Sequence, residues 1–235
     1  WNARERIKEF PFKNRVSKKS PIYEILKNCE LSYSDFKIIK NYSDEIGIDF
    51  FSTPFDIESV DFLDSLGVDK YKVSSFDVNN FDILRHIAKK KKTVIVSVGM
   101  ADLKEINKVF NFLSKYKNKI AILHCISSYP LDPFEANLDV INRLKKQYNC
   151  IIGYSDHTNS IEVPLYAAAM GAQIIEKHYT INKNDNCIDK VVSIDEKQMK
   201  QLNNELNNLS NILGSNFLGL RKVEKNSKQF KRNLK

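Results

Sequence analysis

The chain has 235 residues, of which 42% are hydrophobic and 28% are charged. This composition excludes a disordered tail because it supplies enough apolar residues for a core, and the length fits one large domain. No apolar run approaches the ~18 residues of a membrane span, and the first residues carry no apolar signal core. We therefore expect a cytoplasmic protein without a membrane partner.

The net charge of +8 is concentrated near the ends of the chain. Basic residues gather in 12–20 and 221–235, with a further block at 89–92. Solvated surface explains this distribution, and no basic groove with interleaved aromatic residues is visible, so we expect no nucleic-acid partner. The four cysteines include no CxxC pair and are expected to be reduced thiols that pack in the interior.

Six short runs rich in β-branched and aromatic residues predict six β-strands, over 48–55, 70–75, 93–100, 119–129, 150–157 and 173–180. Apolar residues at helical spacing fill the segments between them. Two further helices have clear caps: one runs from Ser32 to Gly47, and the other runs from Asp195 to Gly214. Helices between successive strands imply parallel pairing, which leaves two α/β architectures open, a doubly wound sheet and a (β/α)8 barrel.

Polar residues concentrate at the carboxyl ends of the predicted strands, the edge at which parallel α/β folds bind ligands. Because residues i and i+2 of a strand share a face, Ser155 with His157 and Glu176 with His178 are expected to project toward one cavity. The sequence has no glycine-rich phosphate loop, so an anion bound at this edge would be held by side chains. The candidates for that role are Lys72 and the serines at these strand ends, among them Ser75, Ser97 and Ser127.

His157 and His178 either share a divalent metal ion or are structural histidines with satisfied hydrogen bonds, and the residues alone leave both alternatives open. His86 on a helix and His124 inside a strand are expected to be structural. The contiguous Ser, Asp and His at 155–157 do not predict a hydrolase triad. Neighbouring strand residues point to opposite faces, and the G-x-S-x-G elbow is absent.

Six segments become recognisable in chain order: FFSTPFDIESVDFLDSLGV, YKVSSFDVNN, VIVSVGMADLKEI, LHCISSYPLDPFEANL, GYSDHT and IIEKHYT. They closely resemble the N-acetylneuraminate (sialic acid) synthase family, which includes the legionaminate and pseudaminate synthases. The resemblance spans roughly residues 20–215, and the GYSDHT and EKHYT pair is highly specific. It selects a (β/α)8 TIM-type barrel in which the six predicted strands are the third to the eighth, with the first two strands lacking.

The resemblance also implies three parts of the chain. Residues 1–31 would form a loop or extension after the missing second strand, and residues 32–214 would form the partial barrel. Residues 215–235 would be a basic linker, and the family's C-terminal antifreeze-like domain would be absent. That domain closes the partner's site in the family's homodimer, so a homodimer is expected for a full-length member.

The activity that the resemblance implies is a condensation of phosphoenolpyruvate with an N-acylated amino sugar such as N-acetylmannosamine. The products would be a nine-carbon 2-keto sugar acid, used in surface polysaccharide biosynthesis, and free phosphate. A divalent ion, Mn²⁺ in most members with Mg²⁺ or Co²⁺ as alternatives, would be held by His157 and His178. An ion with open positions can polarise the sugar carbonyl as a Lewis acid.

Further site residues carry over from the resemblance by position. Glu176 would be a carboxylate near the metal that supports it or handles protons, and it is a catalytic candidate together with Tyr129 and Asp77. The amino sugar would contact Asp77, Tyr129 and Asp189. Phosphoenolpyruvate would contact Thr53, Lys72, Ser75, Ser97, Ser127, Tyr129 and Ser155.

The chain departs from the family pattern in three places. Ser127 stands where the better-known members have Asn, and 186–189 read N-C-I-D where the family has P-G-P-D. The chain also lacks the first strand with its E-I-G-x-N-H-N-G glutamate, together with a lysine and a glutamine from the second strand. We therefore expect a fragment with impaired activity. A non-catalytic ligand-binding remnant of the family and another phosphoenolpyruvate-dependent barrel aldolase remain the alternatives.

Overall fold

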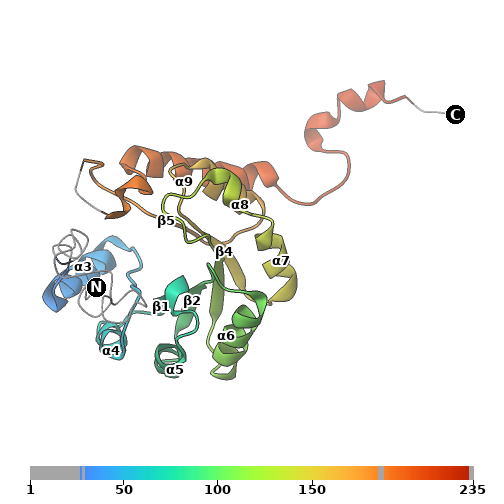
Figure 1. Ribbon diagram of the computed structural model, residues 1–235. Coiled ribbons are helices and arrows are strands. Elements are labelled where there is room, and N and C mark those ends of the chain that lie inside the picture. The colour runs from blue at the N-terminus through green and yellow to red at the C-terminus, as the bar shows by residue number, and fades with distance from the viewer. Residues whose placement is uncertain (1–26, 28–29, 185–187, 233–235) are drawn as a thin grey trace.

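Five parallel strands form a curled half-barrel with helices on its outer face (Figure 1). The computed structural model describes residue 27 and residues 30–184 and 188–232. Neighbouring strands in the sheet are also successive in the chain, in the order β1 to β5. The strands are β1 (Lys70–Val73), β2 (Thr93–Ser97), β3 (Ile120–His124), β4 (Ile151–Asp156) and β5 (Ile175–Lys177).

The prediction of a strand at 48–55, the first of the six in chain order, was wrong. This segment lies beside β1, where the Lys72 N–H donates to the Ser52 carbonyl at 3.3 Å. A strand requires a ladder of such bonds, and this single backbone bond does not make one. The segment is therefore an extended loop, and it ends at the Asp56 cap of the next helix.

The helices that alternate with the strands follow the predicted spacing of apolar residues. Both predicted caps are present: the Ser32 side chain accepts from the Asp35 N–H, and Asp195 accepts from the Gln198 N–H. Gly47 ends the first of these helices at φ 74°, a left-handed conformation that glycine adopts without strain. The helices are α3 (Tyr33–Ile46), α4 (Ile57–Ser65), α5 (Phe81–Lys89), α6 (Leu103–Lys115), α7 (Val140–Gln147), α8 (Glu162–Ala169) and α9 (Glu196–Leu213).

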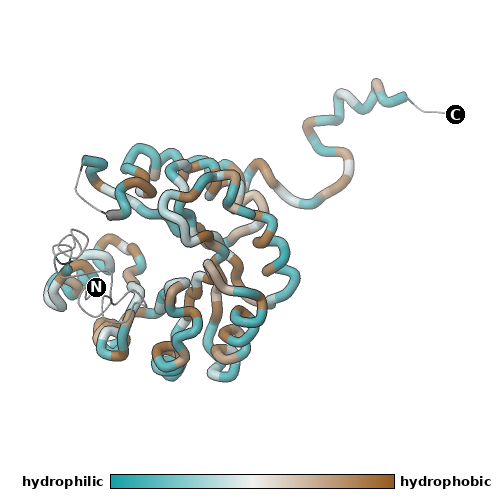
Figure 2. The backbone as a smooth tube through the Cα atoms, in the orientation of Figure 1, coloured by the Kyte–Doolittle hydropathy of each residue, from teal (hydrophilic) through white to brown (hydrophobic). Residues whose placement is uncertain are grey.

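Alternation along the strands creates two apolar layers. Residues such as Tyr71, Val96 and Ile122 face the helices and belong to the large core. A smaller cluster of Ile95, Ala121 and Leu123 fills the inner side of the half-barrel. Figure 2 shows hydrophobic residues on the inner strands, while the surrounding helices carry both hydrophobic and hydrophilic residues. Near the carboxyl ends of the strands this inner side carries polar residues, among them Ser97, Ser155 and Glu176.

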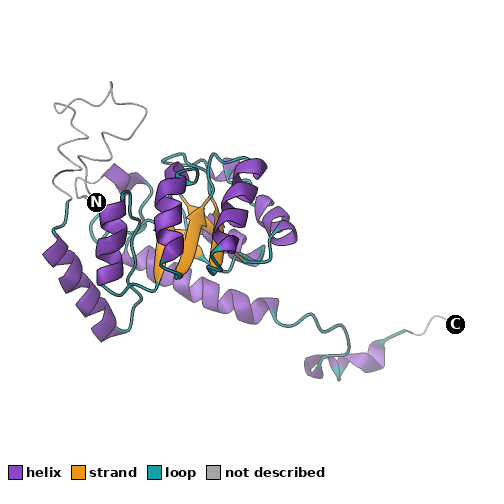
Figure 3. Cartoon of the chain, turned by 90° about the horizontal axis from the view of Figure 1, so that it is seen from below, coloured by secondary structure: helices purple, strands orange, loops and turns teal. Residues whose placement is uncertain are grey.

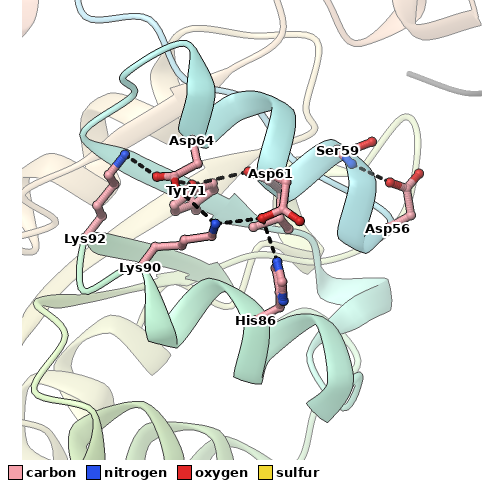
Figure 4. A network of polar contacts seen from close by, with 9 residues as sticks. Asp56, Ser59, Asp61, Asp64, Tyr71, His86, Lys90 and Lys92 are labelled. Carbon is pink, nitrogen blue, oxygen red and sulfur yellow. Dashed lines mark hydrogen bonds and ion pairs between the residues drawn. The ribbon is translucent and has the colours of Figure 1, made fainter.

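A polar network, which we call the basal cluster, joins α4 to α5 at the amino ends of β1 and β2 (Figure 4). Asp61 binds His86 at 2.8 Å and Lys90 at 2.6 Å, and Asp64 binds Lys90 at 3.0 Å and Lys92 at 2.6 Å. These ion pairs and the adjacent lysines hold the pKa values of both aspartates below their usual range. In barrels this end serves stability, which agrees with the structural role expected for His86.

The chain beyond α9 extends away from the half-barrel in both views (Figures 1 and 3). It carries two short 3₁₀ turns, Lys222–Glu224 and Ser227–Phe230. Most of the expected extension at 1–31 lies outside the described residues, as do Asn186 and Cys187. Within the described residues no helix combines the length and the apolarity needed to cross a bilayer.

Candidate active site

The site forms where β4 and β5 end side by side. Ser155 and Glu176 are partners across the ladder, and the Ser155 hydroxyl donates to Glu176 Oε1 at 2.6 Å. The next inward-facing residues are His157 and His178, whose ring centroids lie 5.6 Å apart. The structure therefore brings together the two histidines that strand alternation placed on one face.

Hydrogen bonds fix the tautomer of His157. A carbonyl oxygen can only accept, so Nδ1 carries the proton that is donated to the Ile126 carbonyl at 2.6 Å. Nε2 then has a free lone pair, which accepts from the Tyr129 hydroxyl at 2.9 Å. Burial lowers the pKa of His157, with the Ile126 carbonyl opposing this effect. The neutral ring thus keeps Nε2 unprotonated on the inner face of the half-barrel, as a metal ligand must.

His178 lies in a similar environment. Its ring centroid is 5.8 Å from that of Tyr129, so one phenol ring contacts both imidazoles. Burial lowers the pKa of His178, and the nearby Asp189 carboxylate opposes this shift. Asp189 Oδ2 is 3.7 Å from His178 Nδ1 and comes from the 3₁₀ turn Ile188–Val191. The predicted sugar-contacting Asp189 and the predicted metal ligand His178 are therefore neighbours.

A cation and a carboxylate meet on the inner face near the histidines. The Lys72 ammonium donates to the Ser97 hydroxyl at 2.7 Å and lies 3.4 Å from Glu176 Oε1. The Lys72 side chain is 9% exposed, whereas that of Glu176 is 40% exposed. Lys72, Ser97, Ser155 and Glu176 thus form one connected polar group, with its carboxylate open to a ligand.

A second polar group surrounds Gly99, just after β2. The Ser75 hydroxyl accepts from the Gly99 N–H at 3.0 Å and lies 3.1 Å from Cys125 Sγ. A Cβ atom at position 99 would meet Ser127 Oγ at 2.5 Å and Cys125 Sγ at 2.8 Å. Gly99 therefore allows Ser75 and Ser127 to converge. Sequence reasoning missed Gly99 and Cys125 as site residues, although both lie within runs predicted as strands, 93–100 and 119–129.

Two residues carried over from the resemblance, Asp77 and Thr53, lie in the segments on either side of β1. Asp77 accepts from the Ser74 hydroxyl at 3.1 Å and from the Asn80 side chain at 3.3 Å, so it braces the turn before α5. Thr53 is half-buried in the loop beside β1 and follows Ser52, whose carbonyl binds the Lys72 N–H. The structure does not bring Asp77 into the polar group around Glu176.

The donor set suits an open metal site rather than a closed cage. Across the described part of the chain no group of three or more His, Cys, Asp or Glu side chains converges to hold an ion. Two imidazoles that share an ion through bonds of ~2.1 Å place their centroids about 4.5–6 Å apart. The observed 5.6 Å lies within that range. An ion held by these rings would keep its other positions for water and substrate.

The NeuB family model matches residues 2–217 of the chain. The chain belongs to the NeuB family. The N,N′-diacetyllegionaminic acid synthase of Legionella pneumophila is 38% identical over 208 residues, which are 86% of this chain and 58% of that protein. Mouse (Mus musculus) N-acetylneuraminate-9-phosphate synthase is 33% identical over 208 residues, which are 88% of this chain and 58% of that protein. This NeuB chain thus spans less than two thirds of the length of these relatives.

Solved structures support the fold of this NeuB chain. The N-acetylneuraminic acid synthetase of Leptospira borgpetersenii, solved in complex with citrate, matches with a TM-score of 0.88 at 35% identity. The match covers 97% of this chain and 77% of that one. A truncated 3-deoxy-D-arabino-heptulosonate 7-phosphate synthase from Thermotoga maritima matches with a TM-score of 0.70 at 17% identity, over 79% and 74% of the two chains, which shows the fold alone. The predicted barrel-type α/β fold is confirmed.

Proposed function

We propose that this NeuB chain carries the active-site residues of a nonulosonic (sialic-type) acid synthase. Such an enzyme condenses phosphoenolpyruvate with an N-acylated amino sugar and releases phosphate. Family membership supports a synthase. The observation that carries the proposal is that two polar groups lie side by side at the carboxyl ends of the strands. One group is the His157 and His178 pair, and the other is the group of Lys72, Ser97 and Glu176. One half of this edge offers ligands for a metal, and the other half offers donors for an anion.

We propose that His157 and His178 hold a divalent cation, with Mn²⁺ favoured over Mg²⁺ and Co²⁺. When bound, the cation would act as a Lewis acid on the sugar carbonyl. The hydrogen bonds of His157 support this role because they leave Nε2 unprotonated. The Tyr129 hydroxyl must release Nε2 before an ion can bind there. Tyr129 would then contact the amino sugar, as the resemblance implies.

The anionic substrate would lie over Lys72. The buried ammonium already has Ser97 as a partner, so phosphoenolpyruvate would be held by a preoriented cation and by the hydroxyls of Ser75 and Ser127. Such preorganisation lowers the entropic barrier for two reactants. Glu176 Oε1 accepts from the Ser155 hydroxyl and forms an ion pair with Lys72, and the carboxylate would exchange a proton with the substrate.

A product assay tests this proposal. The chain is incubated with phosphoenolpyruvate, Mn²⁺ and either N-acetylmannosamine or its 4-amino and 6-deoxy relatives, and phosphate and 2-keto acid are measured together. We propose that the 235-residue chain alone gives little product and that adding residues equivalent to the two further barrel strands increases it. Equal release of phosphate and keto acid with one sugar supports a synthase. Phosphoenolpyruvate binding without turnover in either form would favour the ligand-binding remnant, and turnover with a different aldehyde would favour another aldolase.

A further inference from the structure

A buried ion pair lies behind the histidines, on the opposite face of β4 and β5. Asp156 and Lys177 are partners across the ladder, one residue before His157 and His178 respectively. Their charged atoms lie 2.9 Å apart, and the side chains of Lys177 and Asp156 are 2% and 0% exposed. Strand alternation directs this pair toward the helices and directs the imidazoles toward the inner face of the half-barrel.

The Lys177 ammonium has three N–H groups and three oxygen partners. They are Asp156 Oδ2, the Thr158 carbonyl and, at 2.8 Å, the Val192 carbonyl. Thr158 directly follows His157, and its hydroxyl also donates to Asp156 Oδ2 at 2.8 Å. One ammonium therefore joins β5, which carries Lys177, to Asp156 of β4 and to the Thr158 backbone directly after His157.

The third partner connects the same ammonium to the surroundings of His178. Val192 follows the turn that carries Asp189, and its N–H donates to the Asp189 carbonyl at 3.1 Å. Two residues later, the Ile194 N–H donates to the His178 carbonyl at 2.9 Å. Lys177 thus ties together the segment after His157, the turn with Asp189 and the backbone next to His178.

Burying two charges is an expensive way to join two strands. Apolar residues of similar size often stabilise a core as well as a buried ion pair does, because both charges must leave water. An ammonium differs from an apolar side chain because it fixes the directions and distances of three acceptors at once. The arrangement is therefore better suited to orientation than to stability.

We propose that the Asp156–Lys177 pair sets the spacing and orientation of His157 and His178, so that both residues of the pair are positioning residues for a cation bound between the imidazoles. This inference rests on the proposed function in one respect, the binding of that cation. The pair itself lies on the other face of the sheet and does not contact the imidazole rings' open side.

The test compares Mn²⁺ binding by the full chain with that of a double apolar variant, Asp156→Leu with Lys177→Met. Free Mn²⁺ is measured by its electron paramagnetic resonance signal, and folding is checked by circular dichroism and urea unfolding. We expect a folded double variant with ten- to hundredfold weaker Mn²⁺ binding, the range found when partners behind metal ligands are removed. The single variant Lys177→Arg, which keeps Asp156, should bind Mn²⁺ more tightly than the double variant, because arginine is also a cation with several donors.

Lys92→Met is the matched control, since Lys92 also binds an aspartate but belongs to the basal cluster. It should leave Mn²⁺ affinity unchanged. A second measurement needs no metal: ¹⁵N NMR of the imidazole nitrogens should show the Nδ1–H tautomer of His157 in the original chain and altered ring signals in the double variant.

The two readouts separate the two ideas. If the unaltered chain binds no Mn²⁺, the metal part of the proposed function is wrong, and the imidazole spectra alone decide the positioning role. A folded double variant with unchanged Mn²⁺ affinity, or with unchanged spectra where the metal does not bind, would overturn the inference. Weaker Mn²⁺ binding or altered ring signals, with the Lys92→Met control unaffected, would support it.

Discussion

Lys72 on the first strand and Glu176 on the fifth approach to 3.4 Å across the inner face of the half-barrel. In a flat sheet, four strand spacings of about 4.8 Å would separate β1 from β5 by roughly 19 Å. The contact therefore exists only because the sheet curls. Curvature brings a cation from one edge strand to the carboxylate beside the histidines.

Replacing Lys72 by Met is expected to weaken phosphoenolpyruvate binding by about ten- to hundredfold, because a charged hydrogen bond contributes about 1.5–3 kcal/mol. Isothermal titration calorimetry with phosphoenolpyruvate checks this. Lys70→Met is the matched control: Lys70 lies on the same strand but pairs with the exposed Asp49. Similar losses in both variants would contradict a specific role for Lys72.

Replacing Tyr129 by Phe is expected to strengthen Mn²⁺ binding about fivefold. The hydroxyl donates to the His157 lone pair that an ion would need, and breaking a hydrogen bond of this kind costs about 1 kcal/mol. Mn²⁺ titration followed by electron paramagnetic resonance measures the change. His157→Ala should abolish binding in the same assay. Weaker binding by Tyr129→Phe would show that the hydroxyl supports the ion rather than competing with it.

Replacing Gly99 by Ala is expected to destabilise the chain by about 1–3 kcal/mol, the usual cost of overpacking. The added Cβ would meet the side chains of Ser127 and Cys125 at distances below 3.0 Å, so these two side chains must move away from position 99. Urea unfolding measures the free energy, and calorimetry should show weaker phosphoenolpyruvate binding. A variant of unchanged stability and affinity would mean that the second polar group has room to adjust.

We expect the free energy of unfolding to fall in acid because of His124. Its Nε2 lies 2.9 Å from the Ala136 carbonyl, and burial lowers its pKa, so the folded chain holds the ring neutral. Between the lowered folded pKa and the unfolded value of about 6.5, the unfolded chain binds the extra proton, and stability falls as pH falls. Each such proton contributes up to about 1.4 kcal/mol per pH unit.

His124→Gln is the variant that isolates this contribution, because the amide can still donate to the carbonyl without titrating. Urea unfolding is measured at about pH 7.5 and about pH 5, which bracket the unfolded histidine pKa of about 6.5. The free energy of unfolding should depend less on pH in His124→Gln than in the unaltered chain. Parallel curves for the two proteins would remove His124 from the explanation.

Local rules explain how much of the fold could be predicted. The Ser32 and Asp195 caps fix helix starts through bonds within three residues, so sequence alone locates them. The segment 48–55 has strand-like residues, but its state depends on a neighbour far along the chain, and it forms one backbone bond to β1. Local composition cannot report that dependence.

The site was predictable to the extent that strand alternation governs it. Alternation places Ser155 with His157 and Glu176 with His178, and the structure has both pairs on the inner face. The same rule excluded Asp156 from a triad, but it could not identify Lys177 as the partner, because ladder register depends on both strands. Likewise, the contact of Lys72 with Glu176 depends on curvature, which is a property of the whole sheet.

The basal cluster lies at the amino ends of the strands, with Lys92 directly before β2, whereas His157 and His178 directly follow the carboxyl ends of β4 and β5. Attempts to make the molecule more heat-resistant can therefore begin there, for example by exchanging Lys90 for Arg beside the two aspartates that it already joins. A gain in melting temperature obtained at that end should leave ligand recognition intact, so thermal robustness and chemistry can be tuned separately.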